Sequence, residues 1–293
     1  MADSPAPTAA RTGRPARPVN RAQVVRVEEL TPSLLRVFLT GPGLANFTAG
    51  AFTDHYVKLL LPPRGAAYGP GDDVSQIRES YPQSQWPRTR TYTVRSWNAD
   101  TRELAIDVVQ HGDAGLAGPW ARNARPGDTI QFMGPGGAYT PDPAADWHLL
   151  VGDTAVLPAI AASLERIPAG TPVHVIAQVD GPADEIPLES PGDLTVTWLH
   201  HHAGGPDAAA ENPADEPLAA AVRDHDFPEG RVHAFVHGEA VAVRELRRRL
   251  LADLGLTRDQ LSISGYWKRT LDEDGWQSSK REWNAEVEAD VPA

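Results

Sequence analysis

The sequence predicts two domains of different class, an antiparallel β-barrel followed by a parallel α/β domain. Up to residue 133, short stretches rich in β-branched and aromatic residues alternate with turn residues, and helical patterns are almost absent. From His148 onward, apolar strands alternate with amphipathic helices, which is typical of a parallel sheet. A Pro/Asp/Ala-rich linker at 141–145 separates the two patterns. We therefore predict a disordered leader (1–19), a barrel domain (20–143), an α/β domain (144–270) and a helical tail (271–293).

The barrel is expected to contain about six strands and almost no helix except near Trp120. Residues 62–87 are rich in Pro, Gly and Tyr, with little periodicity. A loop of this length inside a compact domain is usually functional or mobile. The expected strands are 23–30, 33–40, 55–61, a strand around 90–95, 103–110 and 129–133.

The α/β domain is expected to contain strands that bind ligands beyond their carboxyl ends, as open parallel sheets do. Apolar residues recur at helical spacing in two segments between these strands. The expected strands are 148–151, 173–179, 194–199, 232–237 and 261–264, and the helices are 155–166 and a stripe of Val243, Leu246, Leu250 and Leu254.

The tail places apolar and basic side chains on one face of a predicted helix. Trp276, Lys280, Trp283 and Val287 follow helical spacing after Asp272. Two tryptophans on one face indicate a surface that is covered. The sequence leaves two interpretations open, a helix packed on its own protein, and a lid or partner surface near the active site.

Composition narrows the classes of partner. The chain has no cysteine, which excludes disulfides, thiolate-bound Fe–S clusters and zinc fingers. Its net charge of −12 disfavours nucleic acid and anionic membrane as partners. We find no apolar run long enough to span a bilayer and no signal-peptide core, and Arg11, Arg14 and Arg17 lie in a stretch typical of a disordered leader rather than of a transit peptide. We predict a cytoplasmic protein, expected to be a monomer.

Two segments have the chemistry to hold a dinucleotide with a flat head. The strand 90–95 (Arg-Thr-Tyr-Thr-Val-Arg) places Arg90 and Tyr92 on one face and Thr93 on the other. A guanidinium binds phosphate bidentately, and an aromatic ring can cover a heterocycle. The glycine-rich turn 111–120 leaves a strand and enters a short helix near Pro119, so its N–H groups can approach a phosphate. Flavin is the first interpretation.

These segments resemble the FAD site of the siderophore-interacting protein family, ferric-siderophore reductases within the ferredoxin-reductase superfamily. The likeness runs from about Val24 to Trp267 and includes Ser-Gly-Tyr-Trp at 264–267. One departure is Leu116, where the family usually has Pro. Because the family contacts the phosphates there largely through backbone, we expect FAD binding to survive it. The FAD contacts that the resemblance implies are Arg90, Tyr92, Thr93, Val94, Asp107, Val109, His111, Gly115, Ala117, Gly118, Trp120 and Thr154.

Two strand-to-helix turns are candidates for binding NAD(P)H. Gly152 and Asp153 follow one strand, and Gly238 and Glu239 follow another. The first turn lacks the glycines of a dinucleotide fingerprint and departs from the family's Gly-Asp-Glu-Thr-Ala pattern, so a plain structural turn is equally supported. Glu239 has the further interpretation of a favourable charge at a helix start. The aromatic residues that could cover flavin or nicotinamide, or lie in the core, are Tyr266 and Trp267.

Basic residues at strand ends are candidates for binding the substrate. Lys58, Arg95, Lys268 and Arg269 fall where the fold should aim them at the inter-domain cleft. In an acidic protein, an anionic substrate requires a local basic patch. The resemblance implies anionic ferric siderophores of the catecholate or hydroxycarboxylate type.

The resemblance implies an NAD(P)H-dependent, FAD-containing ferric-siderophore reductase. No Ser-His-Asp set or metal-ligand spacing occurs, so we predict no resident metal and no catalytic side chain, the flavin itself carrying the chemistry. The alternatives are a ferredoxin-coupled or general flavin reductase, and a non-enzymatic flavoprotein that only binds siderophore.

Overall fold

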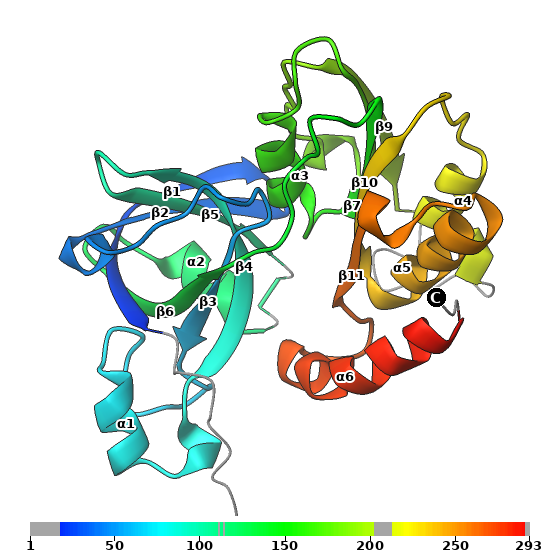
Figure 1. The fold of residues 1–293 in the computed structure, drawn as a ribbon. Helices are drawn as coiled ribbons and strands as arrows, with labels where there is room; N and C mark the ends of the chain where they lie inside the picture. Colours follow the sequence, from blue (N-terminus) through cyan, green and yellow to red (C-terminus); the bar gives the residue numbers. More distant parts are fainter. Residues whose placement is uncertain (1–17, 111, 114, 202–212, 291–293) are drawn as a thin grey trace, which may run out of the picture.

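The computed structural model describes residues 18–110, 112–113, 115–201 and 213–290. The predicted leader up to residue 17 and His111 lie outside the described residues. The N-terminal part is a closed antiparallel barrel, as the sequence predicts, and its strand order is β1-β2-β5-β4-β3-β6 (Figure 1). Its strands are β1 (Val19–Thr31), β2 (Leu34–Thr40), β3 (Tyr56–Leu61), β4 (Arg88–Asn98), β5 (Glu103–Val109) and β6 (Thr129–Gly136).

The barrel forms because alternate residues of its strands are apolar and point inward. Val57 and Leu59 of β3, Leu104 and Ile106 of β5, and Phe132 of β6 are fully buried in one cluster. A short helix, α2 (Ala117–Asn123), covers one side of this cluster, as expected near Trp120. The barrel wall therefore holds β4, which carries the Arg-x-Tyr-Thr sequence.

The segment 62–87 is not a plain loop, in contrast to the prediction. It contains helix α1 (Val74–Ser80) and a 3₁₀ turn, Gln83–Gln85. Asp73 caps α1 by accepting hydrogen bonds from the N–H groups of Ser75 and Gln76 at 2.8 and 3.1 Å. Only Val74 and Ile77 of α1 are buried. Two buried residues are too few to produce a helical period in the sequence, which explains the error.

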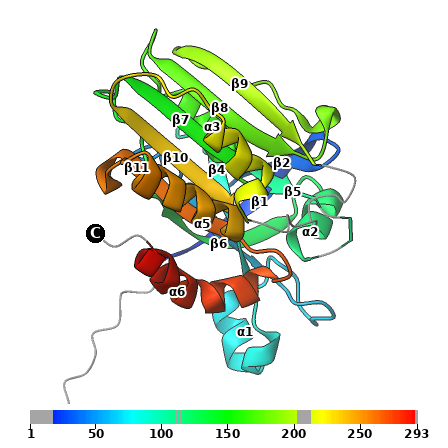
Figure 2. The ribbon, with the colours of Figure 1, turned by 90° about the vertical axis from the view of Figure 1, so that its right-hand side faces the viewer.

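The C-terminal part is a parallel sheet with five strands, as predicted, and its strand order is β11-β10-β7-β8-β9. Helix α3 covers one face, and α4 and α5 cover the other (Figure 2). The sequence missed the short α4. The strands of this part are β7 (Trp147–Asp153), β8 (Pro172–Val179), β9 (Asp193–His200), β10 (Val232–Glu239) and β11 (Leu261–Trp267). Its helices are α3 (Leu157–Leu164), α4 (Pro217–Arg223) and α5 (Ala240–Arg248), which continues as a π-helical turn (Arg249–Asp253). Its 3₁₀ turns are Pro182–Asp184, Pro213–Asp215 and Arg258–Gln260, and the barrel has a further one at Pro42–Leu44.

Helix α3 and its flanks connect the sheet domain to the barrel. The Ser163 hydroxyl lies 2.8 Å from the Thr53 hydroxyl, and Arg166 donates to the Gly50 carbonyl at 2.6 Å. Asp184 accepts a hydrogen bond from the Ser33 N–H at 3.0 Å. These hydrogen bonds join the N-terminal barrel to the C-terminal sheet domain.

The tail forms helix α6 (Glu273–Asp290), which packs on its own protein and also reaches the barrel (Figure 1). Trp276, Trp283 and Val287 are buried against Ala240 and Val243 of α5. The interpretation of a helix packed on its own protein is therefore confirmed, and a lid or partner surface near the active site stays a prediction. No helix among the residues described here is long and apolar enough to cross a membrane.

Candidate functional site

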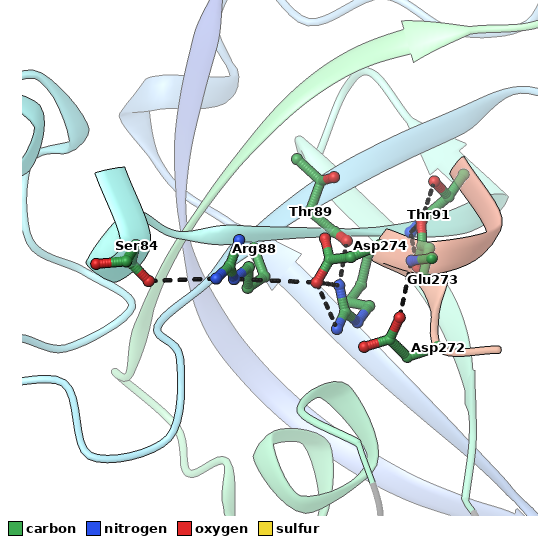
Figure 3. Close-up of polar contacts among 9 residues, drawn as sticks. Ser84, Arg88, Thr89, Thr91, Asp272, Glu273 and Asp274 are labelled. Carbon is green, nitrogen blue, oxygen red and sulfur yellow. Dashed lines mark hydrogen bonds and ion pairs between the residues drawn. The ribbon is translucent and has the colours of Figure 1, made fainter. Parts of the chain in front are cut away.

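The centre of the candidate site is an anion-binding pair of residues on β4. The Arg90 side chain is 11% exposed, and both of its Nη atoms lie 3.4 Å from Asp274 Oδ2. Thr91 donates its N–H to the Glu273 carboxylate at 2.9 and 3.1 Å and its hydroxyl at 2.7 Å (Figure 3). Guanidinium, amide and hydroxyl donors converge here on carboxylate oxygens. The same donors suit the oxygens of a phosphate.

The next residues of β4 turn toward the barrel. Tyr92 is partly buried, packs on the barrel core and lies opposite Val57 of β3. Burial raises the pKa of the Tyr92 phenol well above its usual range, so it stays protonated. Thr93 and Val94 are buried. A role for Tyr92 in covering a flavin therefore rests on the part of its ring that stays accessible.

The glycine-rich turn before α2 is bracketed by two arginines that the sequence analysis did not single out. Arg122 donates to the Gly112 carbonyl and to the Asp113 carboxylate, both at 2.8 Å, and Arg64 donates to the Asp113 carbonyl at 2.6 Å. Gly115 has φ of +71°, a left-handed conformation that favours glycine. In α2, Ala117 and Gly118 are buried, and Trp120 packs on the barrel core. The turn has the backbone freedom that phosphate binding requires.

Asp107 has a partner that the sequence did not reveal. Its buried carboxylate accepts two hydrogen bonds from Arg36, its cross-strand neighbour on β2, at 2.6 and 2.8 Å. Val109 ends the same strand, half-buried. Because Arg36 uses both oxygens of Asp107, a direct contact of this carboxylate with FAD stays a prediction.

The two predicted nucleotide turns meet at the carboxyl ends of β7 and β10. Asp153 is buried and accepts hydrogen bonds from Trp267 Nε1 at 2.7 Å and from the N–H of Glu239 at 3.0 Å. Burial raises the pKa of Asp153 to about 6, although these hydrogen bonds act to lower it. A Cβ at Gly238 would lie 2.7 Å from Asp153 Oδ2, and one at Gly152 would lie 2.5 Å from a side-chain carbon of Val156. Close packing therefore explains both glycines, while the half-buried Thr154 follows at the open side of the turn.

Glu239 and Arg269 belong to the same network. Glu239 caps α5, accepting from the N–H groups of Val241 and Ala242 at 2.7 and 3.2 Å. Arg269 binds Glu216 bidentately at 2.7 and 2.8 Å, which raises the pKa of its guanidinium. The charge of Arg269 is therefore compensated within the protein.

Tyr266 lies against a buried histidine under this edge of the sheet. The rings of Tyr266 and His237 are 4.8 Å apart. His237 Nδ1 donates to the Ser264 carbonyl at 3.0 Å, so Nε2 accepts from the Ser262 hydroxyl at 3.1 Å. Burial lowers the pKa of His237 to about 3, which keeps it neutral. Tyr266 and Trp267 are thus held in fixed positions at the end of β11.

The four predicted substrate residues divide into two pairs. Arg95 is bound to Glu165 of the α3 region at 2.7 Å, and Arg269 is bound to Glu216. Lys58 lies opposite Thr91 on the neighbouring strand, and Lys268 follows β11. Among the described residues, no carboxylate lies within ion-pair distance of Lys58 or Lys268. Only Lys58 is brought beside the anion-binding pair.

Family comparisons match both parts of this arrangement. Residues 23–139 match the siderophore-interacting FAD-binding domain, and residues 145–270 match the siderophore-interacting protein domain. The chain belongs to the siderophore-interacting protein family. An uncharacterised Mycobacterium tuberculosis protein is 42% identical, over 93% of this chain and 98% of that protein. The ferric vibriobactin reductase ViuB of Vibrio cholerae is 33% identical, over 87% and 92%.

Two further members or relatives extend the comparison. The NADPH-dependent ferric-chelate reductase of Escherichia coli is 27% identical, over 83% of this chain and 91% of that enzyme. The crystal structure of the siderophore-interacting protein SipS from Aeromonas hydrophila superposes with a TM-score of 0.74 and 27% identity, covering 92% of this chain and 99% of that one. The fold and both domain matches therefore agree.

The donor set on β4 fits the FAD that this family binds. Carboxylates of Glu273 and Asp274 already lie on Arg90 and Thr91, which shows that these donors take anionic oxygens. The sequence analysis singled out Arg90 but missed Thr91 and the acidic pair. An acidic pair at a helix start was visible in the sequence, but nothing in it indicated contact with a strand 182 residues away.

Proposed function

We propose that this protein is an FAD-dependent reductase that reduces siderophore-bound Fe(III) to Fe(II) with electrons from NAD(P)H. The observation that carries the proposal is the anion-binding pair Arg90 and Thr91, with the ammonium group of Lys58 on the adjacent strand. Family membership and the ferric-vibriobactin and ferric-chelate reductase activities of the ViuB and Escherichia coli relatives support it.

Each group of residues then has a physical task. Arg90, Thr91 and the glycine-rich turn hold the phosphates of FAD. Bound FAD can accept a hydride from a pyridine nucleotide and pass electrons singly to Fe(III). Lys58 and Lys268 attract the anionic ferric complex to an otherwise acidic protein. Arg95 and Arg269 have structural partners and support the site indirectly.

The proposed FAD contacts beyond this pair follow the sequence and the family resemblance. In these roles the protein supplies position and charge, and the iron is a substrate. The proposed contacts are Tyr92, Thr93, Val94, Asp107, Val109, His111, Gly115, Ala117, Gly118, Trp120 and Thr154. We propose domain boundaries of 20–143 and 144–270, a monomeric state and a cytoplasmic location.

For NAD(P)H we propose the carboxyl edge of the parallel sheet, over Gly152, Gly238 and Trp267. Open parallel sheets bind ligands at this edge, and the Escherichia coli relative is NADPH-dependent. A second candidate donor, a reduced ferredoxin, is favoured by one observation. Asp153 and Glu239 put two buried carboxylates at this edge, which is unfavourable for nucleotide phosphates.

An anaerobic mixing experiment tests the proposal. Purified yellow protein is mixed with NADH or NADPH, and then with a ferric siderophore, while flavin absorbance and Fe(II) are followed. We expect bleaching by a nucleotide and recovery with release of Fe(II). Reduction by ferredoxin but by neither nucleotide would replace the donor. A protein that binds siderophore without reoxidation of its flavin would be a binding flavoprotein and no reductase.

A further inference from the structure

The first turn of α6 occupies the anion-binding pair on β4. Glu273 takes all three hydrogen bonds that Thr91 offers it, and Asp274 lies against both Nη atoms of Arg90 (Figure 3). Arg88, two residues earlier on β4, lies 3.9 Å from the same Asp274 carboxylate. The start of the C-terminal helix thus places two carboxylates where a phosphate-binding strand presents its donors.

These carboxylates and a diphosphate cannot use the same donors together. Arg90 has a side chain that is 89% buried, so its Nη atoms have few other directions in which to bind an anion. Two carboxylates next to a diphosphate would repel it by like charge in a partly dry site. Glu273 is itself half-buried and is held by its hydrogen bonds to Thr91. Binding of FAD phosphates at Arg90 therefore requires the first turn of α6 to withdraw.

The rest of α6 is anchored and does not need to move. Trp276, Trp283 and Val287 are buried against α5 and β11. At the far end, Arg244 binds Asp290 at 2.5 and 2.9 Å, and Arg247 donates to the Val287 carbonyl at 3.0 Å. Movement is thereby limited to the first turn and the link from β11.

The link contains a strained residue that can act as a hinge. Thr270, between β11 and α6, has φ of +68°. A β-branched residue in this region is rare, and such strain persists only where the surroundings impose it. Withdrawal of the first turn would let Thr270 relax to an ordinary conformation, which lowers the cost of opening.

We propose that the first turn of α6 is an internal competitor of FAD, in which Glu273 and Asp274 hold the phosphate-binding residues of β4 until FAD displaces them. This inference rests on the proposed function, because it requires that the barrel bind FAD at Arg90. It makes FAD loading and closure of the α6 first turn mutually exclusive.

FAD titrations of the deflavinated protein test the competition. Asp274→Ala and Glu273→Ala should each bind FAD up to about fivefold more tightly than the wild type, equivalent to about 1 kcal/mol. Glu282→Ala is the matched control, since Glu282 is an exposed acid on the same helix and its removal changes the net charge equally. Its affinity should equal that of the wild type. Unchanged or weaker FAD binding by both test variants, or the same gain in the control, would overturn the inference.

Amide hydrogen exchange of the wild-type protein gives a second readout that does not depend on a variant. Addition of FAD should accelerate exchange in residues 270–275 and leave 280–288 unchanged. Slower exchange in 270–275 would show that the first turn closes over FAD, contrary to the inference. If the wild-type protein binds no FAD, the proposed function itself fails, which is a different outcome from FAD binding without release of α6.

Discussion

Replacing Arg90 with alanine should weaken FAD binding by an amount that the structure bounds. A charge-assisted hydrogen bond to phosphate contributes about 1.5–3 kcal/mol. Arg90 pairs with Asp274, whose side chain is 40% exposed. A pair exposed to this degree contributes only about 0–1 kcal/mol, and binding of FAD gives it up. The net loss is therefore about 0.5–3 kcal/mol, or roughly two- to 160-fold in Kd.

Quenching of FAD fluorescence by the deflavinated protein measures this loss. Arg26→Ala is the control, because Arg26 is an exposed arginine on β1 that pairs with Glu28 and Glu103. The control should bind FAD as the wild type does. An unchanged Kd for Arg90→Ala, or an equal loss in the control, would remove Arg90 from the FAD site.

Three further predictions follow from charge, burial and backbone. Lys268→Ala should raise KM for an anionic ferric siderophore by a factor equivalent to about 1 kcal/mol of binding free energy. The effect should be smaller at high salt, and KM for a neutral ferric hydroxamate should not change. Equal effects on both substrates would indicate a packing role. Burial lowers the pKa of His148 from 6.5 to about 4, so the neutral ring stabilises the fold above pH 6.5 and this stability is lost as the pH falls. Between pH 7.5 and pH 5 the wild type should lose about 2 kcal/mol relative to His148→Leu in urea unfolding, and parallel curves would contradict the assignment. Gly238→Ala should lower the free energy of unfolding by about 1–3 kcal/mol, because residue 238 has a φ of +141°. The clash of the added Cβ with Asp153 Oδ2 should lower it further. Gly170→Ala, at φ of +74° with open space around it, should cost less, and equal losses in melting experiments would refute the packing explanation.

The strands and the class of each domain were predictable because their signal is local. Period-two alternation in β3 and β5 puts Val57, Leu59, Leu104 and Ile106 in the core, and the sequence shows that alternation directly. Helix α1 was missed because only Val74 and Ile77 mark its buried face. Elements that depend on a long local pattern are therefore the ones that the sequence reveals.

The polar partners of the site were not predictable, because each joins distant parts of the chain. Asp107 pairs with Arg36 across 71 residues, and Arg269 pairs with Glu216 across 53. Thr91 and Glu273 are 182 residues apart. No periodicity encodes such contacts, so the sequence could assign residue types to chemistry but could not show which charges the fold had already compensated.

The central claim is that flavin held by this barrel reduces siderophore-bound Fe(III). The most direct test is a single turnover without any biological donor. The flavin is reduced under anaerobic conditions by light in the presence of a sacrificial electron donor, and is then mixed in the dark with a ferric siderophore and an Fe(II) indicator. We expect flavin absorbance to return as two Fe(II) form for each reduced flavin, because the flavin carries two electrons and each Fe(III) takes one. Flavin that stays reduced while the iron remains ferric would contradict it.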